Sequence, residues 1–185
     1  MSSDFATYPS LAGRRVFITG GATGIGAALV TAFAAQGAVV GHVDLAAEAA
    51  AILAEALPAA PWFRALDVTD TAALKAAIAD FATHAGGLDV LINNVANDSR
   101  HDPLAVDETR WRSLMAVNLD CGFFAAQAAI PLMRRDKGGA IVNVASVRSV
   151  VAGGGNLQYD TTKAAIAGLT RALAADHSPE GIRVN

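Results

Sequence analysis

The chain has 185 residues, of which 53% are hydrophobic and 17% charged, and its formal net charge is −3. This length suits one globular domain with a substantial core, and the composition excludes a disordered segment. The small negative charge gives no reason to expect nucleic acid or an anionic membrane as a partner, and the interrupted apolar runs look too short to span a bilayer. The first residues carry no basic region followed by an apolar stretch, so we predict a cytoplasmic protein.

Cysteine and histidine usage points away from disulfide and metal chemistry. The single cysteine, Cys121, lies in an apolar stretch without basic or imidazole neighbours, so we expect a packed thiol rather than a nucleophile. A lone cysteine cannot form an internal disulfide, which is compatible with a reducing compartment. No ligand spacing connects the four histidines, and we therefore expect no zinc site.

Short β-branched runs alternate with longer alanine-rich segments along the chain. We predict strands at residues 15–19, 39–43, 62–66, 88–93, 140–145 and 182–185. We predict helices at residues 24–36, 46–57, 70–85 (capped by Asp70), 107–134 (opened by Asp107, with Pro131 near its end) and 158–176. Strands joined by helices need crossover connections, and their continuous hydrophobicity indicates burial on both faces. The sequence therefore predicts a three-layer α/β/α fold with a doubly wound, mostly parallel, Rossmann-like sheet.

A glycine-rich turn, Thr-Gly-Gly-Ala-Thr-Gly-Ile-Gly at residues 19–26, follows the first predicted strand and opens the first helix. Glycines there allow backbone angles closed to other residues and close approach of the main chain to a pyrophosphate. The helix N-terminus presents free N–H groups to the phosphates. The spacing of Gly20, Gly24 and Gly26 differs from the usual G-x-G-x-x-G, and an ordinary tight turn is the alternative. The position after the first strand favours dinucleotide binding.

Asp44 ends the second predicted strand. A carboxylate at this place can accept hydrogen bonds from both adenosine ribose hydroxyls and would repel a 2′-phosphate, so we expect NAD rather than NADP. Capping of the following helix is an alternative role that could coexist with ribose binding. Arg14 and Arg15 precede the first strand, on the wrong side of the sheet to read a 2′-phosphate.

Tyr159 and Lys163 lie four residues apart on a predicted helix and hence on one face of it. A nearby cation stabilises the phenolate, so the tyrosine could take a hydroxyl proton while hydride leaves the carbon, or return it in reduction. Ser146 ends the fifth predicted strand, at the edge where open α/β sheets bind ligands, and could hold the same substrate oxygen. Each of these three residues alone has an ordinary structural explanation. In combination with the glycine-rich turn, the catalytic explanation is favoured.

These features together resemble the short-chain dehydrogenase/reductase family. The matching positions extend over almost the whole chain, and they are Thr19-Gly20-x-x-x-Gly24-x-Gly26, Asp67-Val68, Asn93-Asn94, Asn118, Ser146, Tyr159-x-x-x-Lys163 and Arg183-Val184-Asn185.

The resemblance implies a role for each matching residue. It implies that Tyr159 is the catalytic acid/base, that Lys163 assists it and holds the nicotinamide ribose, and that Ser146 positions the substrate. Asn118 would support a water-mediated proton relay behind Lys163. The implied cofactor-binding residues are Gly20, Thr23, Gly24, Ile25, Gly26, Asp44, Asp67, Val68, Asn94, Tyr159 and Lys163.

The sequence departs from the family in two places. The family commonly has Asn-Asn-Ala-Gly after the fourth strand, whereas Val95 and Ala96 follow Asn94 here and should narrow the space beside the nicotinamide. The sequence also stops within a segment, residues 182–185, that looks like a strand entering the sheet. We therefore expect residues 1–185 to form a single catalytic domain that lacks its C-terminal portion.

Two segments, residues 97–101 (Asn-Asp-Ser-Arg-His) and 8–11, are similar to the aldose 1-dehydrogenase branch, such as bacterial D-xylose dehydrogenases. The polar side chains of this segment beside the active edge, Asn97, Asp98, Arg100 and His101, could hydrogen-bond several sugar hydroxyls, and a solvated polar loop is an equally good explanation. The loop between Ser146 and Tyr159 does not look like that branch. A 3-oxoacyl thioester reductase or another alcohol dehydrogenase, and a non-catalytic dinucleotide sensor, remain alternatives.

The family resemblance implies a homotetramer or homodimer assembled through two long helices. Phe123 and Phe124, and the alanine-rich face at residues 164–173, suit such packing. Burial in the core of one chain explains these residues equally well.

Overall fold

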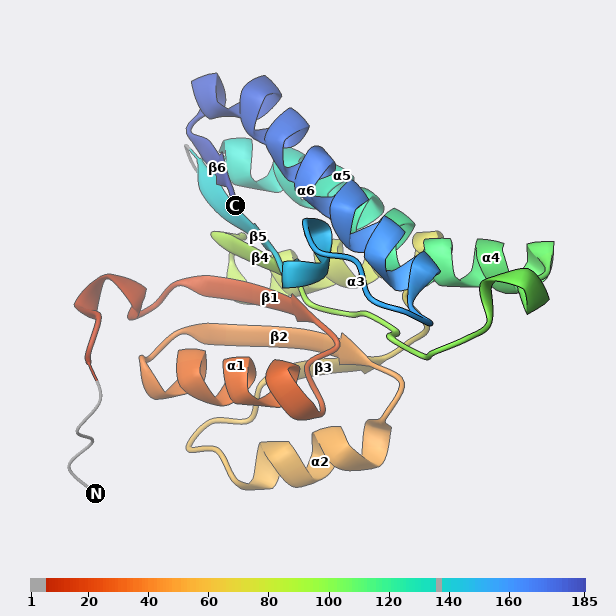
Figure 1. Cartoon of the computed structure of the whole chain (residues 1–185). Helices are drawn as coiled ribbons and strands as arrows, with labels where there is room; N and C mark the ends of the chain where they lie inside the picture. Colours follow the sequence, from red (N-terminus) through yellow and green to blue (C-terminus); the bar gives the residue numbers. More distant parts are fainter. Residues whose placement is uncertain (1–5, 136–137) are drawn as a thin grey trace.

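A computed structural model describes residues 6–135 and 138–185. Its centre is a sheet of six strands, all paired in parallel, in the order β3-β2-β1-β4-β5-β6 (Figure 1). The strands are β1 (Arg15–Thr19), β2 (Val39–Asp44), β3 (Trp62–Ala65), β4 (Val90–Asn93), β5 (Gly139–Asn143) and β6 (Ile182–Val184). This sheet confirms the predicted doubly wound α/β fold, and each strand overlaps the segment predicted for it.

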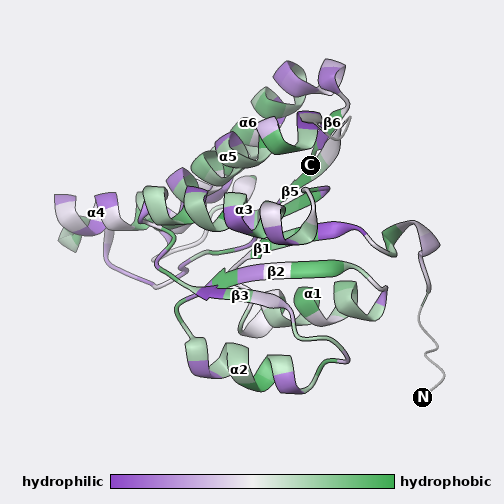
Figure 2. Cartoon of the chain, turned by 180° about the vertical axis from the view of Figure 1, so that it is seen from behind, coloured by the Kyte–Doolittle hydropathy of each residue, from purple (hydrophilic) through white to green (hydrophobic). Residues whose placement is uncertain are grey.

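Helices cover both faces of the sheet, as Figure 1 shows. One face carries α1 (Gly24–Ala35) and α2 (Ala47–Glu55), whose apolar side chains pack with Val16, Ile18 and Val40. The other face carries α3 (Thr71–Ala85), α5 (Cys121–Arg135) and α6 (Leu157–His177), which share a larger core with Phe17, Leu91 and Ile141. The strands between the layers carry long hydrophobic stretches, whereas α4 (Glu108–Met115) is largely hydrophilic (Figure 2).

Local side-chain signals set several helix ends as the sequence predicts. Asp70 caps α3 by accepting a hydrogen bond from the N–H of Ala73 at 2.9 Å, and Gly86 ends the helix with a positive φ of 78°. Asp107 caps α4 in the same way, through the N–H of Arg110 at 2.7 Å. Short 3-10 turns that the sequence did not predict lie at Pro9–Leu11, Pro103–Ala105, Val147–Ser149 and Ser178–Glu180.

The long helix predicted at residues 107–134 is continuous but not regular. A π-helical turn, Ala116–Asp120, joins α4 to α5 and contains Asn118. The helical stretch Glu108–Arg134 is long and apolar enough to cross a membrane by length and composition, which corrects the expectation that no segment reached that length. This stretch packs against α3 and α6 in the larger core, as core helices do, and 44% of its most apolar window is buried.

Cys121 lies inside this core, as expected for a packed thiol. Its side chain is 4% exposed, and its Sγ donates a hydrogen bond to the carbonyl oxygen of Val117 at 2.9 Å. Burial raises the pKa of Cys121 to about 12, so the thiol stays protonated and unreactive at neutral pH.

Candidate active site

A cavity of about 480 Å³ opens at the carboxyl edge of the sheet, beside the end of β1. Strand β1 has β2 as its neighbour on one side and β4 on the other, so the order of the strands reverses there. In open α/β sheets this crossover point is where ligands bind. The ends of β1 to β5 and the start of α6 contribute to the cavity wall. The lining residues are Gly20, Thr23, Ile25, Gly26, Asp44, Leu45, Leu66, Asp67, Val68, Asn94, Val95, Ala96, Asp98, Val117, Val144, Ala145, Tyr159 and Lys163.

The glycine-rich turn forms one wall of this cavity. Gly20 has a positive φ of 71°, and a Cβ at Gly26 would overlap the carbonyl oxygen of Gly20, so neither position accepts a side chain without distortion. The N-cap residue of α1, Thr23, makes no capping hydrogen bond with its side chain. The first-turn N–H groups are therefore left available for an anion, and the cradle fits the pyrophosphate of a dinucleotide.

Asp44 lies at the end of β2 and ties the glycine-rich turn to the strand. One carboxylate oxygen accepts from the N–H of Ala22 at 2.9 Å, and the other accepts from the N–H of Ala46 at 3.0 Å. Helix α2 starts at Ala47, with Ala46 as an N-cap that lacks a side-chain bond, so Asp44 forms an Asx-type turn rather than an N-cap. Each carboxylate oxygen has a further lone pair, which leaves Asp44 able to accept from ribose hydroxyls.

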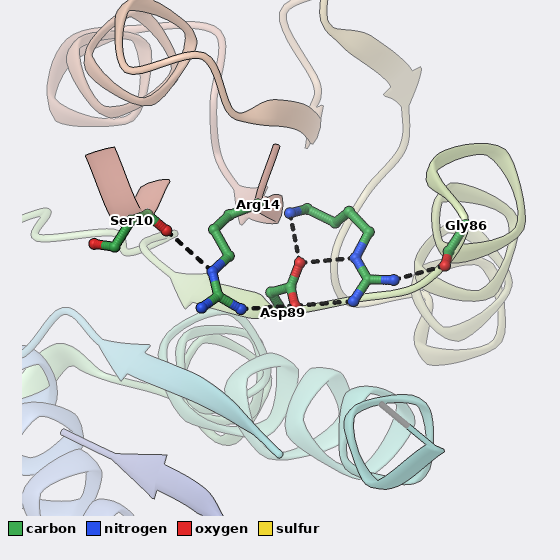
Figure 3. Close-up of polar contacts among 5 residues, drawn as sticks. Ser10, Arg14, Gly86 and Asp89 are labelled. Carbon is green, nitrogen blue, oxygen red and sulfur yellow. Dashed lines mark hydrogen bonds and ion pairs between the residues drawn. The ribbon is translucent and has the colours of Figure 1, made fainter. Parts of the chain in front are cut away.

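Arg14 and Arg15 lie at the opposite edge of the sheet, as predicted. Arg15 binds Asp89 through Nε at 2.7 Å and Nη2 at 2.8 Å, and Arg14 reaches the same carboxylate at 3.3 Å (Figure 3). The hydrogen bond from the Arg15 side chain is the main cause that lowers the pKa of Asp89 to about 2. These arginines fix the start of β1 to the start of β4 and face away from the cavity.

Asp67 and Val68 line the cavity beyond β3, and Asn94 lines it beyond β4. The Asp67 carboxylate accepts from the N–H and the hydroxyl of Thr69, so it braces the loop before α3 while Asp70 caps the helix. Asn94 donates from Nδ2 to the carbonyl oxygens of Thr19 and Gly20, at 3.2 and 3.0 Å. Its amide therefore holds the glycine-rich turn against β4.

Val95 and Ala96 also line the cavity, at the positions where the sequence departs from the family pattern. A Cβ placed on Gly20 would lie 2.7 Å from Cγ2 of Val95. The Val95 side chain thus fills the space directly beside the turn.

Tyr159 and Lys163 occupy one face of α6 and both line the cavity. Lys163 is only 3% exposed, and its Nζ lies 5.6 Å from the centroid of the Tyr159 ring. The ammonium donates to the carbonyl oxygen of Val144 at 2.6 Å. Burial lowers the pKa of Lys163, because desolvation disfavours the charged ammonium.

Ser146, Asn97 and Asn118 lie near the cavity, but they do not belong to the described residues that line it, and neither does Gly24. Ser146 starts the 3-10 turn after β5, and its Oγ accepts from the N–H of Arg148 at 3.2 Å. Asn118 is buried in the π-helical turn, and its side chain pairs with the backbone of Asn97 through two hydrogen bonds of 2.7 and 2.9 Å.

Asp98, one of the polar residues of the segment 97–101 that could bind sugar hydroxyls, lines the cavity. It follows Asn97, whose own side chain turns back to accept from the N–H of Ser99 at 2.9 Å. Asp98 therefore lies in the wall of the cavity that also contains Tyr159 and Lys163. The lining residues that the sequence did not predict are apolar and look like ordinary core positions in the sequence: Leu45, Leu66, Val117, Val144 and Ala145. Among the described residues, no group of three or more His, Cys, Asp and Glu side chains could hold a metal ion.

Comparisons with known proteins agree with this geometry. Residues 14–185 match the short chain dehydrogenase family. A protein of Rhizobium meliloti (strain 1021) named as a probable galactose dehydrogenase is 42% identical over all of this chain and 74% of its own length. A D-xylose 1-dehydrogenase of Caulobacter vibrioides (strain NA1000 / CB15N) is 41% identical over 97% of this chain and 72% of its own.

A crystal structure described as a candidate short-chain alcohol dehydrogenase from Sinorhizobium meliloti 1021 superposes with a TM-score of 0.90. It is 36% identical and covers 94% of this chain and 70% of that one. Family members transfer hydride between a nicotinamide cofactor and a small hydroxyl or carbonyl substrate. The chain therefore belongs to the short-chain dehydrogenase family, and it is an oxidoreductase that acts on CH–OH groups with a nicotinamide cofactor.

Proposed function

We propose that this chain oxidises a hydroxyl of an aldose sugar with NAD, and that Tyr159 is the acid/base of the reaction. The observation that carries the proposal is one cavity that contains both the glycine-rich turn and the pair Tyr159 and Lys163. Bound NAD supplies the hydride acceptor. The residues of the chain bind the dinucleotide, orient the sugar and move its proton.

In this proposal the phenolate oxygen of Tyr159 takes the proton of the substrate hydroxyl as hydride leaves the carbon that bears this hydroxyl. Lys163 favours the phenolate by its charge, and its hydrogen bond to the carbonyl of Val144 holds the ammonium beside the ring. Ser146 would donate from Oγ to the substrate oxygen. The relay role that the resemblance implies for Asn118 stays a prediction. The contacts of Asn118 in this structure hold residue 97, and with it the neighbouring Asp98.

NAD is preferred over NADP in this proposal because Asp44 stands where the ribose hydroxyls would bind. Leu45, which follows it, is 73% exposed and brings no positive charge for a 2′-phosphate. The arginines nearest in sequence to β1 are occupied at the opposite edge of the sheet.

The aldose assignment is supported by the names of the two sugar dehydrogenases that resemble the chain. It is also supported by Asp98, because a carboxylate in the cavity can accept hydrogen bonds from sugar hydroxyls. We place Asp98, rather than Asn97, at the substrate. The alternatives within the same chemistry are a 3-oxoacyl thioester reductase and another alcohol dehydrogenase.

We further propose a cytoplasmic homodimer or homotetramer formed through the outer faces of α5 and α6. A shallow groove on these helices is lined by Leu119, Asp120, Phe123, Phe124, Ala165 and Leu169. Phe123 is 38% exposed there. Covering this aromatic surface with a second copy would remove it from water.

The test is a screen of NAD and NADP reduction, followed by nicotinamide absorbance, with D-xylose, D-galactose and a simple secondary alcohol. The expected result is activity with an aldose and NAD, and its loss by at least about a hundredfold in Tyr159→Phe, because the proton acceptor is removed. The Asp98→Ala variant loses the carboxylate, so its KM for the sugar should rise more than its KM for NAD. A Tyr159→Phe variant that keeps wild-type activity would refute the mechanism, and preference for the alcohol would refute the substrate.

A further inference from the structure

The loop between β5 and α6 connects the two residues that must meet at the substrate oxygen. Ser146 lies at its start, and Tyr159 lies in the first turn of α6. Residues 153–155 of this loop are all glycine, so they offer no side chains that could pack and hold its shape. The spacing of Ser146 from Tyr159 must nevertheless be fixed, because small displacements of catalytic groups cost large factors in rate.

Asp160, the residue after Tyr159, binds this loop. Its Oδ2 accepts from the N–H of Gly153 at 2.9 Å and lies 3.6 Å from Nη1 of Arg148. The Asp160 and Arg148 side chains are 13% and 25% exposed, so water screens the pair only in part. The other oxygen of Asp160 is buried without a hydrogen-bond partner among the described residues, which makes the carboxylate depend on Arg148 for its charge compensation.

Arg148 stands at the other end of the same connection. It follows Ser146 by two residues, and its N–H donates to Oγ of Ser146. Its guanidinium lies directly over Gly153, where a Cβ would overlap it, whereas a Cβ at the neighbouring Gly154 would meet nothing within 4 Å. The Arg148 guanidinium thus reaches Asp160 through the space that a Cβ at residue 153 would occupy, and an alanine there would make the guanidinium shift.

We propose that Arg148 and Asp160 are positioning residues that set Ser146 at the distance from Tyr159 that the reaction needs. The pair joins the residue after the acid/base to the turn that begins at Ser146, and it acts beside the hydrogen bond from Oγ of Ser149 to the carbonyl oxygen of Lys163 at 2.8 Å. This inference rests on the proposed roles of Ser146 and Tyr159. The pair touches neither the reacting atoms nor the cavity wall, so its effect is transmitted through the loop.

The experiment compares Arg148→Met, Asp160→Asn and Gly153→Ala with the matched control Gly154→Ala in the full chain. Neither Gly153 nor Gly154 has a positive φ, so both alanines are compatible with the backbone. NAD and D-xylose, or D-galactose if that sugar is the better substrate, serve as probes. We measure kcat, the KM for the sugar, the Kd for NAD and the thermal midpoint.

We expect kcat to fall by about 10- to 100-fold in the three test variants, as for a displaced catalytic group. The Kd for NAD should stay within about twofold, because the lining of the cofactor cavity is unchanged. Gly154→Ala should keep the wild-type kcat, and Arg148→Lys should recover part of the loss in Arg148→Met. A purely structural role would lower the thermal midpoint and affect NAD binding and kcat together.

Wild-type kcat in Arg148→Met and Gly153→Ala would overturn the proposal, and so would equal losses in Gly153→Ala and Gly154→Ala. Tyr159→Phe, measured in parallel, separates this failure from that of the proposed function. An inactive Tyr159→Phe beside a fully active Arg148→Met overturns the positioning pair alone. An active Tyr159→Phe overturns the proposed function, and the pair with it.

Discussion

We expect His42 to make the stability of the protein sensitive to mild acid. Its side chain is fully buried in β2, and neither ring nitrogen has a hydrogen-bond partner among the described residues. The ring lies directly beneath Gly21 and 4.9 Å from the ring of Phe63. Burial lowers the pKa of His42 from 6.5 to about 4, although the nearby Asp44 carboxylate acts in the opposite direction.

The size of the effect follows from proton binding in the two states. The unfolded chain takes up a proton at His42 near pH 6.5, whereas the folded protein takes it up only near pH 4. Below pH 6.5 the unfolded state therefore binds more protons, and the free energy of unfolding falls as the pH is lowered. The free energy of unfolding is lower by about 2 kcal/mol at pH 5, and by about 3 kcal/mol once the pH lies below both pKa values.

The assay is urea unfolding of the wild type and of His42→Leu at about pH 7.5 and about pH 5. Leucine has a similar volume and no polar atoms, so at the higher pH we expect a change of less than about 1.5 kcal/mol. At the lower pH the wild type should lose about 2 kcal/mol more than the variant. His84 is exposed, and His84→Gln should behave as the wild type. An equal loss on acidification in the wild type and His42→Leu would refute the reasoning.

Three further changes test the dinucleotide site and the opposite edge of the sheet. Gly26→Ala places a Cβ against a main-chain oxygen of the same turn, so NAD affinity measured by calorimetry should fall by more than about tenfold. The control Gly168→Ala has open space around the new Cβ and should leave NAD affinity unchanged. Asp44→Asn should weaken NAD by about 10- to 100-fold and narrow its preference over NADP, and equal NAD affinity would contradict the ribose role. Asp89→Asn should lower the free energy of unfolding by about 2 kcal/mol at pH 7 because Arg15 lowers the pKa of Asp89. This contribution is present above pH 4 and lost as the pH falls toward 2, so a difference from wild type that persists unchanged at pH 2 would contradict it.

The elements that the sequence predicts well are those with local signals. The buried strand β1 continues after Arg15 with consecutive β-branched and aromatic residues, and the sequence of α3 contains both its cap, Asp70, and its terminator, Gly86. The π-helical turn at Ala116–Asp120 carries no such signal, because its residues are compatible with an ordinary helix. The turn is recognisable only from the hydrogen-bond pattern of the folded chain.

The candidate site also contains residues that the sequence predicts and residues that it does not. Residues that end a strand, such as Asp44, are predictable because parallel strands bring their carboxyl ends to one edge. The sequence does not predict which of Asn97 and Asp98 lines the cavity. The outcome depends on Asn118, 21 residues away, which pairs with the backbone of residue 97 while residue 98 lies at the cavity. His42 likewise gives no sign of its environment, since in sequence it is only a polar residue in a strand.

Asp160 shows where the limit of sequence reasoning lies. In the pattern Tyr-x-x-x-Lys the intervening positions have no assigned chemistry, so a carboxylate directly after Tyr159 reads as a polar residue on the helix surface. Its partners are brought to it by the return of the loop, which places Gly153 and Arg148 against the first turn of α6. Because one contact is made by the main-chain N–H of Gly153 and the other by a long flexible arginine, neither leaves a periodic or spacing signal. The geometry that fixes Ser146 relative to Tyr159 is therefore a property of the folded loop, although both residues, which we propose as catalytic, can be proposed from the sequence.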